Sequence, residues 1–157
     1  MEEYAMLKLD NQLCFRLYTA SRNVVRRYAP YLKPLGLTYT QYLAMMVLWE
    51  QERVTVTGLC KRLGLETSTV TPLLKKLEAD GLVIRTRSER DERVCEVVPT
   101  QRGWELREQA AKVPACMADD LCVDIETIEQ LAGLLDKFNE QVETSGSKQG
   151  ARDGIRC

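Results

Sequence analysis

The chain has 157 residues, of which 45% are hydrophobic and 29% are charged, and its formal net charge is −1. These proportions are typical of a globular domain with its own core and argue against a disordered or fibrous chain. Neither an apolar run of about 18 residues nor an apolar N-terminal leader is visible, so we expect a cytoplasmic protein with no membrane partner.

The chain contains six cysteines and no histidine. A core of this size needs no disulfides, and in a reducing cytosol the cysteines are expected to be thiols. Because no two cysteines have CxxC spacing and histidine is absent, we expect no metal site. The lack of histidine also removes the usual acid–base and nucleophile-activating arrangements of enzymes, so we expect neither catalysis nor a cofactor.

Charge is distributed unevenly along the chain. Basic residues are concentrated in residues 22–27, 61–62, 75–76 and 85–93, whereas acidic residues dominate residues 119–143. A chain with little net charge can therefore still present one basic face to the phosphates of a nucleic acid.

The first part of the chain predicts a helical scaffold. Apolar residues at helical spacing predict a helix over residues 10–29, capped by Asp10 and ended by Pro30. Thr38 and Gln41 have the spacing of a capping box, and the residues after them predict a second amphipathic helix.

The middle of the chain has the element order of a winged helix-turn-helix. After a short helix, a turn is expected at Gly64, followed by a helix over residues 67–80 that Gly81 ends. Two β-prone runs, residues 82–87 and 94–98, flank a charged turn and predict a hairpin. The expected fold class is mainly α with a small β-hairpin wing.

The C-terminal part predicts two further helices and a tail. Thr100 is expected to cap a helix over residues 101–122 with a kink or break at Pro114, and a last helix is expected over residues 124–142. Residues 144–157 are rich in glycine, serine and charge, which predicts a flexible tail.

The second helix of the helix-turn-helix carries candidate DNA contacts. In this motif the first residues of that helix face base edges in the major groove. Short polar side chains suit bases and phosphates, and lysines suit phosphates, although a capped surface helix has a similar composition. The candidates are Thr67, Ser68, Thr69, Thr71, Lys75 and Lys76.

The charged turn of the hairpin favours the DNA-binding interpretation. An arginine-rich turn of this size can enter a narrow minor groove or contact a phosphate strand. Acidic residues offset much of its charge, and an aspartate is expected to pair with an arginine and hold the turn in shape. The candidates in the hairpin are Arg85, Arg87, Arg90, Asp91 and Arg93.

Two segments of the chain resemble the MarR family of multiple-antibiotic-resistance-type regulators. The first segment resembles the recognition helix and wing of the family, including its Asp-x-Arg motif at Asp91 and Arg93; it reads LGLETSTVTPLLKKLEADGLVIRTRSERDERVCEVVPTQRG. The second segment resembles the organic hydroperoxide resistance repressors of that family and their staphylococcal redox-sensing relatives; it reads LDNQLCFRLYTASRNVVRRYAPYLKPLGLTYTQYLAMMVLWE. The likeness extends over residues 8–139.

The resemblance implies a homodimer of MarR-type architecture that represses transcription at a pseudo-palindromic operator on double-stranded DNA. Residues 1–36 and 101–143 would form the helical dimerisation region, residues 37–100 the winged helix-turn-helix domain, and residues 144–157 the tail. The broad apolar face of the last helices fits such a dimer, although an intramolecular core would also explain it.

The resemblance also implies a peroxide-sensing cysteine at Cys14. In the family two tyrosines stabilise the thiolate, and the matching residues are Tyr28 and Tyr39, with Tyr18 one turn from Cys14. Fourteen residues of one helix, about 21 Å, separate Cys14 from Tyr28, so their contact requires a second subunit. From its spacing alone, Cys14 is also compatible with a small core residue.

The chemistry implied is oxidation of the Cys14 thiolate to a sulfenic acid by an organic hydroperoxide or a related oxidant, followed by a disulfide. Cys116 of the opposite subunit is the favoured second thiol, Cys122 is another candidate, and a small thiol is the remaining alternative. Oxidation would shift the dimer between two states and release the DNA.

Three other functions stay open on this basis. A MarR-type repressor could bind a small aromatic ligand between its domains, with Cys14 only packing. A cysteine-based peroxidase would use the same activated thiol, but it would leave the winged helix unexplained. A protein–protein module could use a winged-helix scaffold without binding DNA.

Overall fold

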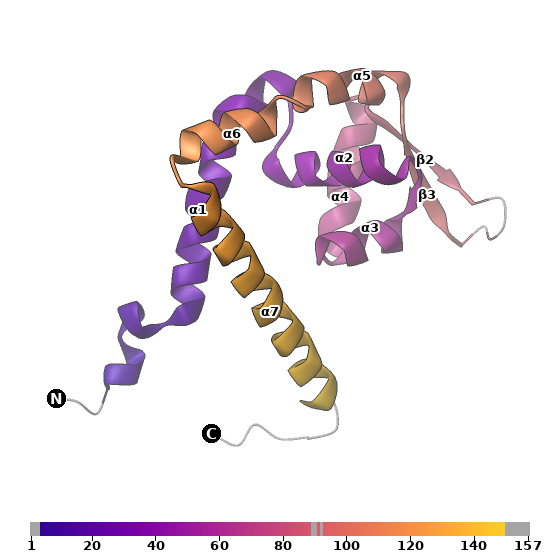
Figure 1. Ribbon diagram of the computed structural model, residues 1–157. Helices are drawn as coiled ribbons and strands as arrows, with labels where there is room; N and C mark the ends of the chain where they lie inside the picture. The colour runs from indigo at the N-terminus through magenta and orange to yellow at the C-terminus, as the bar shows by residue number, and fades with distance from the viewer. Residues whose placement is uncertain (1–3, 89–90, 92, 150–157) are drawn as a thin grey trace. The chain divides into compact units, whose positions relative to one another are not determined.

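The computed structural model describes residues 4–88, 91 and 93–149 of the chain. The chain divides into two compact units, Met1–Leu121 and Cys122–Cys157. The first unit contains helices α1 to α6 and the β-sheet, and the second contains helix α7 (Figure 1). Within the described residues, no helix is both long enough and apolar enough to span a membrane.

Helix α1, Leu13–Leu32, begins later than predicted. Asp10 is not its cap, because it lies within a 3-10 turn, Leu9–Asn11, after an earlier one at Ala5–Leu7. The backbone carbonyl of Asp10 instead accepts a hydrogen bond from Arg16 Nη2 at 2.7 Å. The later start makes Cys14 the second residue of the helix.

The prediction that Pro30 ends α1 is wrong. The helix continues to Leu32, which is buried, and a 3-10 turn, Lys33–Leu35, follows directly. Proline removes one intrahelical hydrogen bond, and so close to the end of a helix that loss is small beside the burial of Leu32. Gly36 then reverses the chain with a φ of 68°.

Helix α2, Tyr39–Gln51, begins with the predicted capping box. The backbone N–H of Gln41 donates to the Thr38 hydroxyl, and the backbone N–H of Thr38 donates to Gln41 Oε1 at 2.8 Å. Most of α2 is buried, which makes it the central helix of the first unit.

The helix-turn-helix is formed by α3, Val56–Leu63, and α4, Thr67–Ala79. The turn between them contains Gly64 with a φ of 63°, as the pattern predicted. Gly81, with a φ of 70°, follows α4 and leads into the sheet.

The sheet has a strand that the sequence pattern did not predict. The predicted hairpin is formed by β2, Val83–Arg87, and β3, Cys95–Pro99, in antiparallel register. A two-residue strand, β1, Val54–Thr55, pairs with the other edge of β3, so the strand order is β1-β3-β2. So short a strand has no periodicity of its own and forms only because its partner lies about forty residues further along the chain.

The helix predicted over residues 101–122 is broken into two. Helix α5, Gln101–Ala110, is capped by Thr100 as predicted, and α6 is Val113–Leu121. The break lies just before Pro114, which occupies the first turn of α6, where its missing N–H has little cost.

The core of the first unit lies around α2. Apolar side chains from α1 to α6 and from all three strands converge there; the fully buried ones with the largest volumes are Met45, Leu48, Leu59, Leu74, Leu77, Val70, Val83 and Val97. Trp49 joins this core to α5, because its indole N–H donates to the carbonyl of Gly103 at 2.8 Å.

Helix α7, Ile125–Gln149, is longer than predicted. Asp124 begins it by accepting hydrogen bonds from the backbone N–H and the hydroxyl of Thr127. The tail expected over residues 144–157 is therefore wrong for residues 144–149, which are helical, and residues 150–157 lie outside the described part of the chain.

Among the described glycines of the first unit, Gly103 has the least space for a side chain. A Cβ built there would collide with the backbone carbonyl of Leu82. We predict that Gly103→Ala destabilises the protein by about 1–3 kcal/mol, since neither backbone segment can move freely. Gly133→Ala is the matched control, because its Cβ would meet nothing within 4 Å.

The measurement is the thermal or urea unfolding of both variants. The control should gain about 0.5–1 kcal/mol from replacing a glycine inside a helix. A Gly103→Ala protein as stable as the wild type would show that α5 does not need this close approach.

Candidate functional site

The predicted recognition helix, α4, has one buried face and one exposed face. Val70, Leu74 and Leu77 are buried in the core. The face presented to solvent begins at the N-terminus of the helix; Thr67, Ser68, Thr69, Lys75 and Lys76 are exposed, and Thr71 is half-buried. The candidate contacts therefore share the accessible side of one helix, which is the geometry that major-groove binding requires.

The C-terminal turn of α4 carries an ion pair along its own surface. Lys76 Nζ lies 2.7 Å from Asp80 Oδ1, four residues further on. Such exposed pairs stabilise a helix only slightly, so Lys76 can exchange Asp80 for a phosphate at little cost.

Arg85 has an internal partner, which the sequence did not predict. Its guanidinium donates from Nε and Nη2 to Glu78 Oε2, at 2.9 and 2.6 Å. The hydrogen bond from Arg85 holds the pKa of the Glu78 carboxyl below its ordinary value. The structure thus assigns the Arg85 guanidinium to a link between β2 and α4, whereas the sequence predicted a DNA contact.

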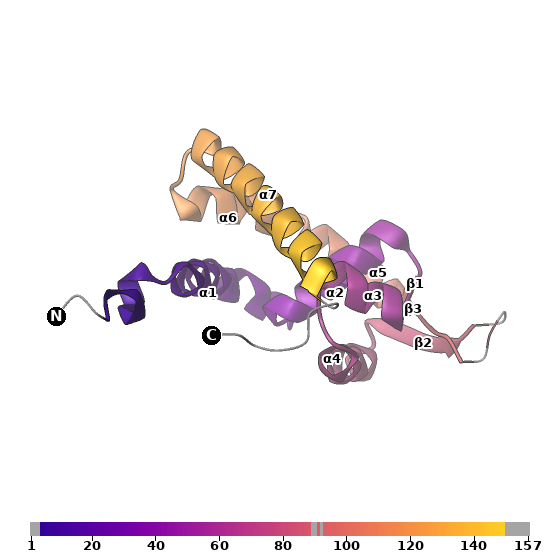
Figure 2. The same cartoon turned by 90° about the horizontal axis from the view of Figure 1, so that it is seen from below.

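The β2–β3 hairpin extends away from the helices (Figure 2). Arg87 and Arg93 are exposed at its outer part. Asp91 shapes the turn, because its Oδ1 accepts the backbone N–H of Arg93 at 2.9 Å. Its predicted pairing with a guanidinium stays a prediction. Arg90, another predicted contact, lies outside the described residues.

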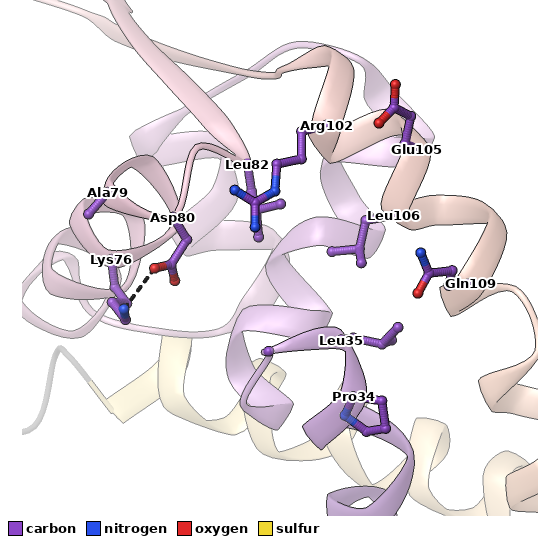
Figure 3. A pocket seen from close by; sticks show the side chains of 11 residues that line it. Pro34, Leu35, Lys76, Ala79, Asp80, Leu82, Arg102, Glu105, Leu106 and Gln109 are labelled. Carbon is purple, nitrogen blue, oxygen red and sulfur yellow. Dashed lines mark hydrogen bonds and ion pairs between the residues drawn. The ribbon is translucent and has the colours of Figure 1, made fainter.

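A pocket of about 780 Å³ lies between the end of α4, the turn after α1 and α5 (Figure 3). Its wall combines apolar side chains, such as Leu35 and Leu106, with charged ones. The Lys76–Asp80 pair lines one side, and Arg102 is the other cation. The pocket is large enough for a small organic molecule.

Cys14 is exposed in the first turn of α1. Tyr18, one turn further along, is also exposed, and its hydroxyl accepts a hydrogen bond from Arg22 Nη1 at 3.0 Å. The Arg22 guanidinium also lies 5.3 Å from the centre of the Tyr18 ring. Because its oxygen accepts from Arg22, the Tyr18 phenol is free to donate its own proton elsewhere.

Two of the predicted tyrosines are brought together, with a third that was not predicted. The rings of Tyr28 and Tyr39 are 4.9 Å apart, and Tyr42 lies 6.0 Å from Tyr28. Burial raises the pKa of Tyr39 and of Tyr42, with a further contribution from Tyr28. These two phenols therefore stay protonated and can act as hydrogen-bond donors at neutral pH.

The structure does not bring Cys14 to these tyrosines within one chain. Both Cys14 and Tyr28 lie on α1, a continuous helix, so about 21 Å separates them. The thiol and the phenol cluster therefore lie at opposite ends of one helix.

Cys116, a candidate second thiol, lies beside the tyrosine end of α1. It is exposed on α6, and it contributes with burial and Asp120 to raising the pKa of Tyr31. Arg27 holds α6 against α1, since its Nη1 lies 3.3 Å from Asp120 Oδ2 and donates to the Asp120 carbonyl at 2.8 Å. Cys116 is thus on the same end of α1 as Tyr28 and remote from Cys14 of its own chain.

Cys122, the other candidate, begins the second unit. It is exposed and has a φ of 50°, an unusual conformation for a residue other than glycine. Within the described residues, no group of three or more His, Cys, Asp or Glu side chains could hold a metal ion.

Large apolar side chains are exposed on the N-terminal part of the chain and on α7. Met6 and Leu7 are 81% and 77% exposed, and Ile125 and Leu134 are 74% and 65% exposed. None of the described side chains of α7 is buried. Exposed apolar side chains in such number are more than isolated surface residues usually supply.

Comparison with known proteins agrees with this geometry. Residues 37–95 match the model of the MarR family. The organic hydroperoxide resistance transcriptional regulator of Bacillus subtilis (strain 168) is 42% identical over 129 residues, which is 82% of this chain and 88% of that protein.

Two solved structures are also similar. Reduced AbfR bound to DNA has a TM-score of 0.76 and 31% identity, covering 92% of this chain and 98% of that one. Disulfide-formed AbfR has a TM-score of 0.62 and 32% identity, covering 87% and 96% of the two chains.

The helix-turn-helix, the wing and the extent of these similarities lead to one conclusion: the chain belongs to the MarR family of transcriptional regulators.

Proposed function

We propose that this chain forms a homodimer that represses transcription by binding DNA and releases the DNA when an organic hydroperoxide oxidises Cys14. One observation carries the proposal. The exposed thiol lies at one end of α1 and the tyrosine cluster at the other, about 21 Å away. Only a second copy of the chain, with its α1 crossing the first, can complete the site.

The DNA-binding part of the proposal rests on α4 and the hairpin. Exposed hydroxyl groups at the start of α4 suit base edges, and Lys75 and Lys76 suit phosphates. Arg87 and Arg93 extend the basic surface to the hairpin, where they would reach the minor groove or a phosphate strand. Reduced AbfR, a similar structure, is bound to DNA.

The exposed apolar residues support the dimer part of the proposal. Ile128, Leu131 and Phe138 are exposed on α7, and a partner helix would cover them. We assign residues 1–36 and 101–143 to dimerisation and residues 37–100 to DNA binding. A symmetric dimer with two such DNA-binding parts matches a pseudo-palindromic operator.

The proposal that Cys14 is the sensor is supported by the groups that would surround its thiolate. The N-terminus of α1 favours a negative charge, because its first backbone N–H groups have no intrahelical partners. Tyr18 of the same chain, with Tyr28 and Tyr39 of the other, would donate hydrogen bonds to the sulfur. The thiolate would then be both stabilised and reachable by peroxide.

The proposed oxidation of Cys14 has two steps. The Cys14 thiolate attacks the terminal oxygen of the hydroperoxide, the O–O bond breaks, and the alkoxide leaves and takes up a proton as an alcohol. The thiolate of Cys116 from the other chain then attacks the sulfenic sulfur, and hydroxide leaves as water. Cys116 is favoured because it lies beside Tyr31, at the end of α1 that the opposite Cys14 approaches.

A second function has one observation in its favour. The pocket of about 780 Å³ has apolar side chains, such as Leu35 and Leu106, beside charged ones of both signs, and its size suits a small aromatic ligand. A repressor controlled in this way would release DNA whether or not Cys14 is present.

The first prediction concerns the sensor. Cys14→Ser should bind DNA as tightly as the wild type but should no longer release it on treatment with cumene hydroperoxide, because no sulfenic acid can form. The measurement is a gel shift with a duplex selected from a random library by the reduced wild type. Release from the Cys14→Ser protein would place the sensor elsewhere.

The second prediction concerns the wing. Arg93→Ala should lose about 1–3 kcal/mol of binding free energy for the same duplex, since a charged contact is removed. Arg107→Ala is the control, because this exposed arginine lies over the Trp104 ring on α5. Both variants should elute as dimers in gel filtration, and equal DNA affinities would contradict the wing contact.

The third prediction concerns the second thiol. After peroxide treatment the wild type should run as a covalent dimer on a non-reducing gel, and Cys116→Ser should run as a monomer. Cys122→Ser, which removes the other candidate, should still form the dimer. The reverse pattern would transfer the role to Cys122, and monomers from all proteins would favour a small thiol.

A further inference from the structure

Three hydrogen bonds join the last turns of α4 to β2. Besides the two bonds from the Arg85 guanidinium, Glu78 Oε1 accepts the backbone N–H of Arg85 at 3.2 Å. One carboxylate therefore holds both the side chain and the backbone of the strand. Hydrogen bonds between charged groups are shorter and stronger than those between neutral groups, so this pair ties the strand firmly to the helix. We call this pair the Glu78–Arg85 clamp.

The clamp lies where two candidate DNA-contacting elements meet. Arg85 precedes the exposed Arg87 by two residues on β2, and the hairpin turn begins after it. Along the chain, α4 and β2 are connected by only three residues, with Gly81 in a left-handed conformation. The start of β2 is fixed, because the backbone N–H of Leu82 donates to the Leu77 carbonyl and the backbone N–H of Thr100 donates to the Leu82 carbonyl. The clamp lies further along the strand and restrains the part of the hairpin that leads to its turn.

The two charged groups of the clamp form an ion pair with each other. The side chain of Arg85 is only 25% exposed, and both Nε and Nη2 point to Glu78. A guanidinium already neutralised in this way adds little to the attraction for phosphate.

We propose that the Glu78–Arg85 clamp is a positioning pair that sets the angle between the recognition helix and the wing, so that both engage one DNA site together. This inference rests on the proposed DNA-binding function. Arg85 acts through the wing and does not contact DNA. Loss of either partner releases the outer part of the hairpin from α4, and the wing contacts are lost while those of α4 remain.

The direction in which one substitution changes the affinity for DNA distinguishes a clamp from a DNA contact. Glu78→Gln removes a negative charge near a polyanion, so it should tighten binding if electrostatics alone mattered. A clamp predicts the opposite, a loss of about tenfold, equal to that of Arg85→Gln. The double variant should lose no more than either single one, because both break the same link.

Asp80→Asn is the matched control. It removes the same charge from the end of the same helix, but Asp80 pairs with Lys76 on α4 and not with the strand. Its affinity for the selected duplex should equal or exceed that of the wild type. Thermal melting should show that all four proteins are folded at the assay temperature.

Hydroxyl-radical footprints show at which positions of the DNA the variants lose their contacts. Glu78→Gln and Arg85→Gln should lose protection at the outer positions, where the wings lie, and keep it at the positions that α4 covers. Binding of Glu78→Gln at wild-type strength or tighter, additive losses in the double variant, or uniform loss of protection would overturn the clamp. Failure of the wild type to select any duplex would overturn DNA binding itself, and the clamp with it.

Discussion

The rigidity of α1 is the constraint on which the proposed switch depends. A helix of 20 residues that rises about 1.5 Å per residue cannot fold back on itself, so Cys14 and Tyr28 stay at opposite ends. In the proposed dimer, the sulfur of Cys14 has its hydrogen-bond donors on the other chain, which couples its oxidation to the contact between subunits. When the sulfur changes its charge and its bonding, the contact between two subunits changes, and not only a local pocket.

The contacts of the first unit provide a continuous route from α1 to the DNA-binding elements. Arg27 holds α6 against α1, and the buried Leu32 anchors the end of α1 in the core. Trp49 then links the core to α5 through the carbonyl of Gly103. Close packing without empty space transmits small displacements along such a route. In the proposed mechanism, a shift between the two α1 helices therefore alters the position of α4 and the wing.

Much of the fold was predictable because its signals are local. The capping box of Thr38, the turn at Gly64 and the cap at Thr100 each depend on a few neighbouring residues, and all three are confirmed. The errors occurred where a local signal was weaker than packing. Pro30 normally ends a helix, but burial of Leu32 extends α1 beyond it. The tyrosine cluster was predictable only by resemblance, and Tyr42 joins it because α2 packs against α1.

The sequence by itself determined the order of the long helices and of the two hairpin strands, the resemblance to the family, and which residues carry charge, thiol or phenol groups. These properties follow from periodicity and side-chain chemistry, which do not depend on distant parts of the chain. Only the tertiary structure decided which groups meet. Glu78 and Arg85 look like two more surface charges until α4 and β2 pack side by side, and β1 becomes a strand only beside β3. Pairing between separate elements depends on the path of the backbone in space, and no local pattern encodes it.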